Sequence, residues 1–232
     1  MRAGSLKMVG LFLMMGMTFF HCARHPHLQQ NKTYTYQYMR KGHDIGREIF
    51  VVERKGKHLV MKSDLNIGDV NSYQRGESEL VFQKDGKPVA YSRVLEVKLP
   101  ETPAQNGLWE LRYVFQRKTV TGEVVKDRST QWKGAIEVGK GEVYCIDNNA
   151  PSLLAILIKA AYPKLEGKAA YAVRAFHFSE ARVRDVTFTK IRDGVYRCRI
   201  GAINVGDLSV RDGLLISIEH GDPKKGLVIR LR

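Results

Sequence analysis

The side chains best suited to chemistry in this 232-residue chain are histidines and carboxylates near its start. His43, Asp44 and Glu48 lie close together in sequence, and His58 follows them. Imidazole and carboxylate groups bind metal ions and transfer protons. This spacing matches no metal-ligand motif, however, and polar residues are typical of hairpin tips. We therefore expect no metal, no cofactor and no catalytic residue in this group.

Other candidate catalytic residues have simpler interpretations. His177 alternates with Ala175 and Ser179 in a strand-like segment, which indicates a strand residue rather than a base. No serine lies in the Gly-x-Ser-x-Gly context of a nucleophile elbow. The polar run 147–149 is explained by capping of the helix that follows it. The sequence therefore predicts that the protein is not an enzyme, and a hydrolase with an unrecognised site is the least favoured alternative.

Two cysteines, Cys145 and Cys198, leave two alternatives open. Each lies in a strand-like segment, and the two are far apart in sequence. An oxidising compartment permits a disulfide between them, which would stabilise the fold by about 2–4 kcal/mol. The alternative is two buried thiols that pack as small apolar side chains. Since sequence does not show whether the two strands are neighbours, the disulfide stays a candidate.

The third cysteine, Cys22, directly follows an apolar segment. Basic residues precede the apolar run 8–20, which is the pattern of an export signal and is short for a membrane-spanning helix. A cysteine at this position resembles the lipobox of bacterial lipoproteins, where the chain is cleaved and the cysteine is acylated. His21 differs from the small residue usual there, so a plain signal peptide is the alternative. We expect residues 1–21 to be a signal peptide and Cys22 to be the lipidation site.

An acylated Cys22 would hold the protein on a membrane. The polar segment 22–32 has the composition of a tether, in which His25 and His27 are solvated spacers. Residues 33–232 are expected to form a single β-rich domain, because no low-complexity linker interrupts them. We therefore expect an exported protein on the periplasmic face of a bacterial envelope membrane, and favour the outer membrane.

The chain is strongly basic, with 38 Lys and Arg against 24 Asp and Glu and a formal charge of +14. An excess of positive charge favours anionic partners. In an exported protein these are lipid headgroups or another anionic envelope ligand, and we expect no nucleic acid. Because the basic residues are spread along the chain, a merely solvated basic surface is the alternative.

Alternating apolar residues predict β-strands through most of the chain. In the segment 108–116, one face of the expected strand carries only large apolar side chains, which is typical of a half-buried strand. These are Trp109, Leu111, Tyr113 and Phe115. Asp-Gly and similar turns separate such segments at short intervals. The sequence predicts a mainly β fold, a large curved antiparallel meander that forms a half-barrel or open barrel.

One segment predicts a helix instead. Residues 150–162 are apolar around most of a helix, so such a helix requires burial on most sides. Asn148 or Asn149 can cap its start, and Pro163 is expected to stop it. This short hydrophobic helix is too short to cross a bilayer. We therefore expect the curved sheet to enclose it.

Four segments resemble a group of exported bacterial proteins, often lipoproteins, in which a large curved antiparallel sheet wraps a helix. They are the strand 34–36, the hairpin 42–46 with the strand after it, the polar run 147–149, and the closing strand 226–231. The lipoprotein-localisation carriers share this architecture. The resemblance implies a cavity or groove between helix and sheet for an apolar or amphipathic molecule.

Four apolar residues are the candidate lining of this groove. They are Leu153 and Leu157 on the helix, and Trp109 and Tyr113 on the sheet. The function expected from sequence is a cell-envelope lipoprotein that binds or carries a lipid-like or amphipathic molecule. The alternative is a structural envelope protein whose sheet docks another envelope component. A pocket of several hundred Å3 would favour the first function.

Overall fold

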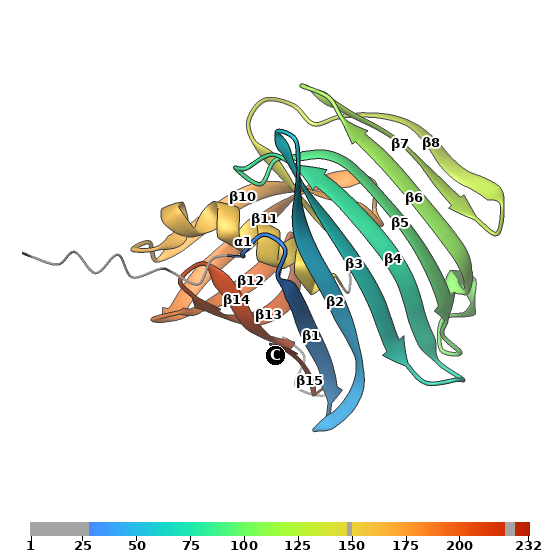
Figure 1. Cartoon of the computed structure of the whole chain (residues 1–232), viewed down its shortest axis with the longest axis horizontal. Coiled ribbons are helices and arrows are strands. Elements are labelled where there is room, and N and C mark those ends of the chain that lie inside the picture. The colour runs from blue at the N-terminus through green and yellow to red at the C-terminus, as the bar shows by residue number, and fades with distance from the viewer. Residues whose placement is uncertain (1–27, 148–149, 221–225) are drawn as a thin grey trace, which may run out of the picture.

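The computed structural model describes residues 28–147, 150–220 and 226–232. Within them the chain forms one 15-stranded sheet and one α-helix, α1. The sheet is large, strongly curved and not closed into a barrel, and α1 lies on its concave side (Figure 1). The predicted fold class is therefore confirmed.

The first half of the sheet is a meander of eight strands. They are β1 (Thr33–Arg40), β2 (His43–Lys55), β3 (His58–Gly68), β4 (Tyr73–Phe82), β5 (Pro88–Lys98), β6 (Gly107–Phe115), β7 (Thr119–Lys126) and β8 (Ser129–Glu137). A short 3-10 turn, η1 (Pro103–Gln105), lies between β5 and β6. Each of these strands pairs with the next in antiparallel register, as the short turns require.

The second half contains α1 and seven strands. They are β9 (Val143–Ile146), α1 (Pro151–Leu165), β10 (Ala170–His177), β11 (Arg182–Arg192), β12 (Val195–Ile200), β13 (Ile203–Arg211), β14 (Leu214–His220) and β15 (Leu227–Leu231). β15 pairs with β1 and so joins the two halves. β9 and β10 are parallel, because α1 carries the chain back to the end of the sheet where β9 began.

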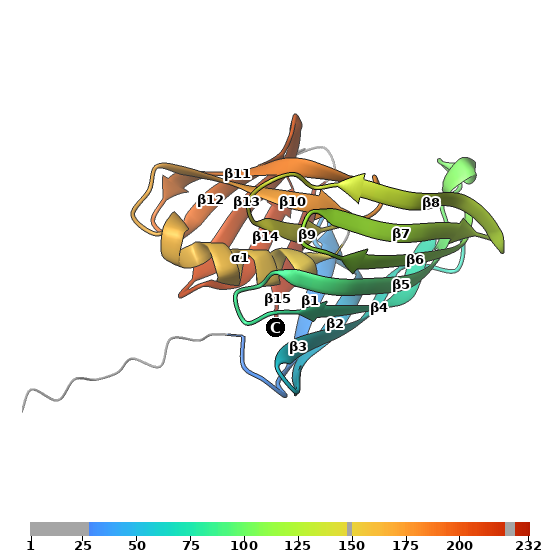
Figure 2. The same ribbon diagram turned by 90° about the horizontal axis from the view of Figure 1, so that it is seen from above.

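The sheet curls until its two halves meet. β9, at one edge, contacts β5 in the middle of the first half (Figure 2). Phe176 of β10 packs edge-on against Tyr113 and Phe115 of β6, with ring centroids 5.2 and 5.6 Å apart. The strands beyond β5 therefore extend past the β9 edge and cover β10. Side-chain packing, rather than a hydrogen-bonded strand pair, holds the curl together at this point.

Helix α1 fills one part of the curl. Most of its residues are buried, including Leu153 and Leu157, as its apolar sequence predicts. The expectation that Pro163 stops the helix is wrong, since α1 continues to Leu165. The last turn survives because the Glu166 amide, which follows the proline, donates to the Tyr162 carbonyl at 2.9 Å.

The start of α1 is capped differently from the prediction. Asn148 and Asn149 lie outside the described residues, and Ala150 occupies the N-cap position without a side-chain hydrogen bond. Pro151 occupies the first turn, where its missing N–H costs nothing. The first turn donates hydrogen bonds to a side chain of β2 instead.

The described chain begins at Leu28, which packs in the core. Lys159 of α1 donates to the Leu28 carbonyl at 3.0 Å, and the Asn31 amide donates to the Val52 carbonyl at 2.8 Å. The last residues of the expected tether therefore lie against the domain. The expected signal peptide 1–21, Cys22, His25 and His27 fall outside the described residues. Within the described ranges, no helix is long and apolar enough to span a membrane.

The curled sheet has two ends, and α1 runs from one to the other. At the end where α1 begins lie the turns 41–42, 69–72 and 178–181, and we call this end the mouth. At the opposite end, where α1 finishes, lie the turns 56–57 and 83–87 and the start of β1. This assignment follows from the antiparallel pairing of successive strands.

Candidate functional site: the mouth of the curled sheet

A buried carboxylate of the sheet accepts hydrogen bonds from the first turn of α1. Glu48 alternates in β2 with exposed and half-exposed neighbours, so it points to the concave side, where it is 1% exposed. It accepts hydrogen bonds from the Ser152 amide at 3.0 Å and from the Ser152 hydroxyl at 2.6 Å. Burial raises the pKa of Glu48, and the Ser152 bonds only partly offset that rise.

A buried ion pair lies near this helix start. Arg93 of β5 donates to the Asp147 carboxylate at 2.7 Å, and the two side chains are 5% and 0% exposed. Asp147 also accepts from the amide of Ser179 at 3.2 Å and from its hydroxyl. Asp147 thereby ties β5 in the first half of the sheet to the β10–β11 turn in the second. Buried ion pairs rarely stabilise a fold more than apolar residues of similar size would.

Two grooves meet at Asp147. The first, of about 300 Å3, lies between the start of α1 and strands β12–β15. Ala150, Pro151 and Leu154 form its helix side. Its sheet side is mostly apolar, from Ile200, Ile203, Val205, Ile218, Leu227 and Ile229, with Asn204, His177 and His220 as polar residues. This arrangement gives an apolar slot with a few polar groups, the usual composition of a small-molecule site.

The second groove, of about 360 Å3, lies between strands β4–β7 and the β10–β11 turn. Its apolar side chains are Leu95, Val97, Trp109, Leu111 and Val124. Its polar residues are Gln74, Gln105, Arg93, Asp147, Ser179 and Glu180. Trp109 is held in place because its indole N–H donates to the Gln105 carbonyl at 2.8 Å, while Lys126 lies 5.2 Å from the ring centroid.

A third hollow, of about 300 Å3, completes the mouth. It lies among the turns that follow β1 and β3, and it shares Gln74 with the second groove and Leu227 with the first. The three hollows therefore lie beside one another at this end of the sheet, and the buried Asp147 lines the first two.

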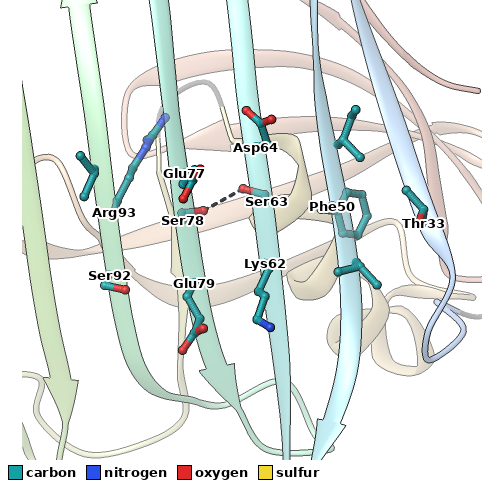
Figure 3. Close-up of a pocket in the computed structure, with 13 residues that line it drawn as sticks. Thr33, Phe50, Lys62, Ser63, Asp64, Glu77, Ser78, Glu79, Ser92 and Arg93 are labelled. Carbon is teal, nitrogen blue, oxygen red and sulfur yellow. Dashed lines mark hydrogen bonds between the residues drawn. The ribbon is translucent and has the colours of Figure 1, made fainter.

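A larger depression, of about 470 Å3, lies on the face of β2–β5 away from α1 (Figure 3). Figure 3 shows Ser63 and Ser78 pointing toward one another, and their hydroxyls are 2.8 Å apart. Exposed charged side chains also line this depression, among them Lys62, Asp64 and Glu77. We place the candidate site in the mouth instead, because an open depression among exposed charges would desolvate little of a ligand.

The structure brings only one of the four predicted groove residues to a groove. Trp109 lines the second groove, whereas Leu153 and Leu157 of α1 are buried in the core. Tyr113 is also buried, and its hydroxyl donates to the Phe178 carbonyl at 2.8 Å. The helix residue that does line a groove is Leu154. Helix periodicity identifies an apolar face but does not show which of its members lies at the rim.

The histidines and carboxylates near the start of the chain do not come together in one site. Asp44 lies at the mouth, His58 at the opposite end, and Glu48 inside, where it binds Ser152. Among the described residues, no group of three or more His, Cys, Asp or Glu side chains could hold a metal ion. His177 is buried at 2% exposure in a strand and borders the first groove.

Of the two alternatives for Cys145 and Cys198, the structure has the buried thiols. The cysteines lie on β9 and β12, which β10 and β11 separate. Neighbouring strands are about 4.8 Å apart, so three strand spacings alone amount to roughly 14 Å. The register also offsets the two cysteines along the strands, which puts them well beyond disulfide reach. Burial raises the pKa of both thiols, that of Cys198 to about 12.

Fold and site together define a mainly β protein with one enclosed helix and a ligand-sized opening. A DUF1089 family protein from Pseudomonas aeruginosa, known from its crystal structure, is similar to this chain at 14% identity and a TM-score of 0.44. The match covers 73% of this chain and 87% of that protein. No protein-family model matches the chain, and no curated protein does so. These comparisons lend no support to the expected resemblance to lipoprotein-localisation carriers, which stays an architectural analogy.

Proposed function

We propose that the protein binds a lipid-like or amphipathic molecule in the mouth of the curled sheet. The observation that carries this proposal is the first groove, about 300 Å3 in volume, with apolar walls from both α1 and the sheet. Apolar surface that enters such a groove leaves water at a gain of about 25 cal/mol per Å2. An alkyl or acyl chain fits this chemistry, since it needs no hydrogen-bond partner.

The polar end of the ligand belongs near the second groove. Gln74, Gln105 and Ser179 offer amide and hydroxyl groups there, beside the Arg93–Asp147 pair. The adjacent charges have opposite signs, so a hydrogen-bonding head group is favoured over one with a large net charge. Asp147 borders both grooves, and the proposal places the apolar and polar parts of one molecule on its two sides.

The proposed setting is the bacterial cell envelope, with the protein anchored by an acyl chain on Cys22. This part of the proposal rests on the apolar run 8–20 and the cysteine that follows it. A lipid-binding mouth and a membrane anchor suit the same task, because both bring the protein and its ligand to one bilayer. Binding or transfer without catalysis is the proposed activity.

A docking role is the second candidate. Val94, Leu108 and Val114 are exposed at 47%, 42% and 51% on the outer face of β5 and β6. They share this face with the charged Glu110 and Arg112, so it is a mixed apolar and charged surface, as protein interfaces commonly are. If the mouth binds no apolar probe, this face becomes the stronger candidate for function.

The first test is binding of N-phenylnaphthylamine, an uncharged apolar probe whose fluorescence rises out of water. Ile203→Glu puts a charge on the wall of the first groove, at a residue already 58% exposed. Ile191→Glu is the matched control, because Ile191 is 47% exposed and lines none of the three hollows. We expect the probe to bind, and Ile203→Glu alone to weaken it by about tenfold, since charge disfavours apolar contact.

Native mass spectrometry of the protein, purified gently from an envelope extract with Cys22→Ser, identifies the natural ligand class. An added mass that organic solvent extracts supports the proposal. A protein that carries no such mass and does not bind the probe contradicts it, as does equal weakening by the two isoleucine variants.

A further inference from the structure

The end of the sheet opposite the mouth carries a group of exposed basic residues. They lie at the tips of three hairpins, β2–β3, β4–β5 and β6–β7, and just before β1, all at the same end of the strands. We call them the basic rim: Lys32, Lys55, Lys57, Lys84, Arg117 and Lys118. Within the described part of the chain, none of the six forms an ion pair with a carboxylate.

A surface hollow of about 480 Å3 lies within this rim. Its lining is Lys57, His58, Gln83, Lys84 and Asp85. Asp85 is the acidic member, and Lys87 already pairs with it at 2.8 Å. Lys57 and Lys84 therefore approach one another from neighbouring hairpins without a carboxylate of their own, which leaves a locally positive surface.

The mouth carries both signs of charge. It has ion pairs, such as Arg182–Glu180 at 2.6 Å and Arg93–Asp147 at 2.7 Å, and also exposed basic residues, Lys41, Lys98 and Arg128. Acidic residues also occur there without an arginine pair, at Asp44, Asp69 and Asp127. The basic rim itself lies at the opposite end of the strands from the mouth, with Asp85 as the acidic residue in its hollow.

The N-terminal segment reaches the domain at this same end. Leu28 is held by Lys159 near the finish of α1, and Lys32 of the rim follows it. Cys22 precedes Leu28 by six residues in sequence, and an extended chain rises at most about 3.6 Å per residue. A membrane anchor on Cys22 would therefore keep the rim, rather than the mouth, close to the bilayer.

We propose that the basic rim is a docking surface for an anionic lipid bilayer. The tips of successive hairpins form a broad edge, which suits an extended charged surface, and each cation near such a surface contributes about fivefold to binding at low salt. The rim then lies on the headgroups, and the mouth opens away from the membrane that anchors the protein. The inference rests on the proposed function only for the role of Cys22.

Vesicle co-sedimentation tests this proposal. The protein used is the chain from residue 22 with Cys22→Ser, which keeps every described residue. The rim variant is Lys57→Gln/Lys84→Gln/Lys118→Gln. The matched control, Lys41→Gln/Lys98→Gln/Arg128→Gln, removes the same charge from exposed residues around the mouth. The vesicles contain phosphatidylcholine with or without phosphatidylglycerol.

We expect binding to phosphatidylglycerol-containing vesicles that weakens with salt, and a loss of more than about tenfold in the rim variant alone. Equal losses in the two variants would show that only total charge matters, and would overturn the proposal. No binding by the parent protein would overturn it too, as would a rim variant that loses binding to soluble polyphosphate but not to vesicles. Probe binding in the mouth is measured on the same samples, so failure of the rim and failure of the ligand site are distinguishable.

Discussion

The carboxylate of Glu48 accepts two hydrogen bonds from Ser152, one from its amide and one from its hydroxyl, across 104 residues of sequence. The first turn of a helix has amide groups without helical partners, and its positive end favours a carboxylate. Glu48 therefore does from β2 what a capping residue usually does from within the chain. It fixes the start of α1 against the sheet, beside the groove that Pro151 and Leu154 line.

Replacing Glu48 tests this relationship. Glu48→Gln keeps an acceptor for the Ser152 amide and a donor for its hydroxyl, so we expect a loss in unfolding free energy within about 1 kcal/mol. Glu48→Ala leaves the buried Ser152 groups unsatisfied and should cost about 2 kcal/mol or more. Urea unfolding followed by circular dichroism measures both values. Equal losses in the two variants would contradict a capping role.

Glu48 also predicts a pH dependence. Its folded pKa is raised above the ordinary value of 4.5, chiefly by burial. The folded protein then holds this proton more tightly than the unfolded chain does, so proton binding to Glu48 stabilises the fold at low pH. This stabilisation is lost as pH rises from about 4.5 through the raised pKa. We expect the stability of the parent protein relative to Glu48→Gln to fall over this range, which urea unfolding at a series of pH values measures. A stability difference that stays constant with pH would contradict the raised pKa.

Losing one member of the Arg93–Asp147 pair should lower the free energy of unfolding much more than replacing both members. Arg93→Met leaves the Asp147 carboxylate buried without its cation, which should cost about 3–5 kcal/mol. Arg93→Met/Asp147→Leu removes both charges and should recover most of that loss. Arg112→Met is the control, since Arg112 pairs with Glu110 at the surface and should contribute less than about 1 kcal/mol. A double variant no more stable than Arg93→Met would contradict this account.

The two buried cysteines should be unreactive but not bonded. Burial raises both thiol pKa values, so little thiolate forms near neutral pH. In the Cys22→Ser protein, we expect iodoacetamide to label neither Cys145 nor Cys198 under native conditions, and to label both in denaturant without reductant. Mass spectrometry reads the result. Labelling that requires prior reduction would instead indicate a disulfide.

Leu28 should contribute to stability although it lies in the segment expected to be a tether. Its side chain is 5% exposed, so Leu28→Ala should cost about 2–3 kcal/mol through a cavity and lost apolar burial. Leu108→Ala, at a residue 42% exposed, is the control and should change stability by less than about 0.5 kcal/mol. A neutral Leu28→Ala would indicate that residues before β1 are dispensable.

Several features were predictable because their cause is local. The alternation in β6 placed Leu111 and Tyr113 on the buried face, since strand side chains alternate by geometry alone. The apolar run before Pro163 predicted the enclosed helix, because helix periodicity also depends only on nearby residues. Its C-terminal boundary was wrong, because a proline near the end of a helix removes only one hydrogen bond, and the following amide can still close the turn.

The candidate site was not predictable in the same way. Trp109 was identified as an apolar strand residue, but its place beside Asp147 depends on how far the sheet curls. The capping of Ser152 by Glu48 likewise depends on β2 passing the start of α1. Nothing in the local sequence of Arg93 indicates a buried partner 54 residues away.

The sequence by itself determined the strands, the turns, the enclosed helix and the excess of positive charge, because each depends on neighbouring residues or on composition. Only the tertiary structure decided that Cys145 and Cys198 lie apart, that three hollows meet at one mouth, and that the basic rim lies at the opposite end. The physical reason is strand order. Contacts between distant segments depend on which edges pair and how the sheet twists and curls, and these are set by packing of the whole core rather than by any local pattern.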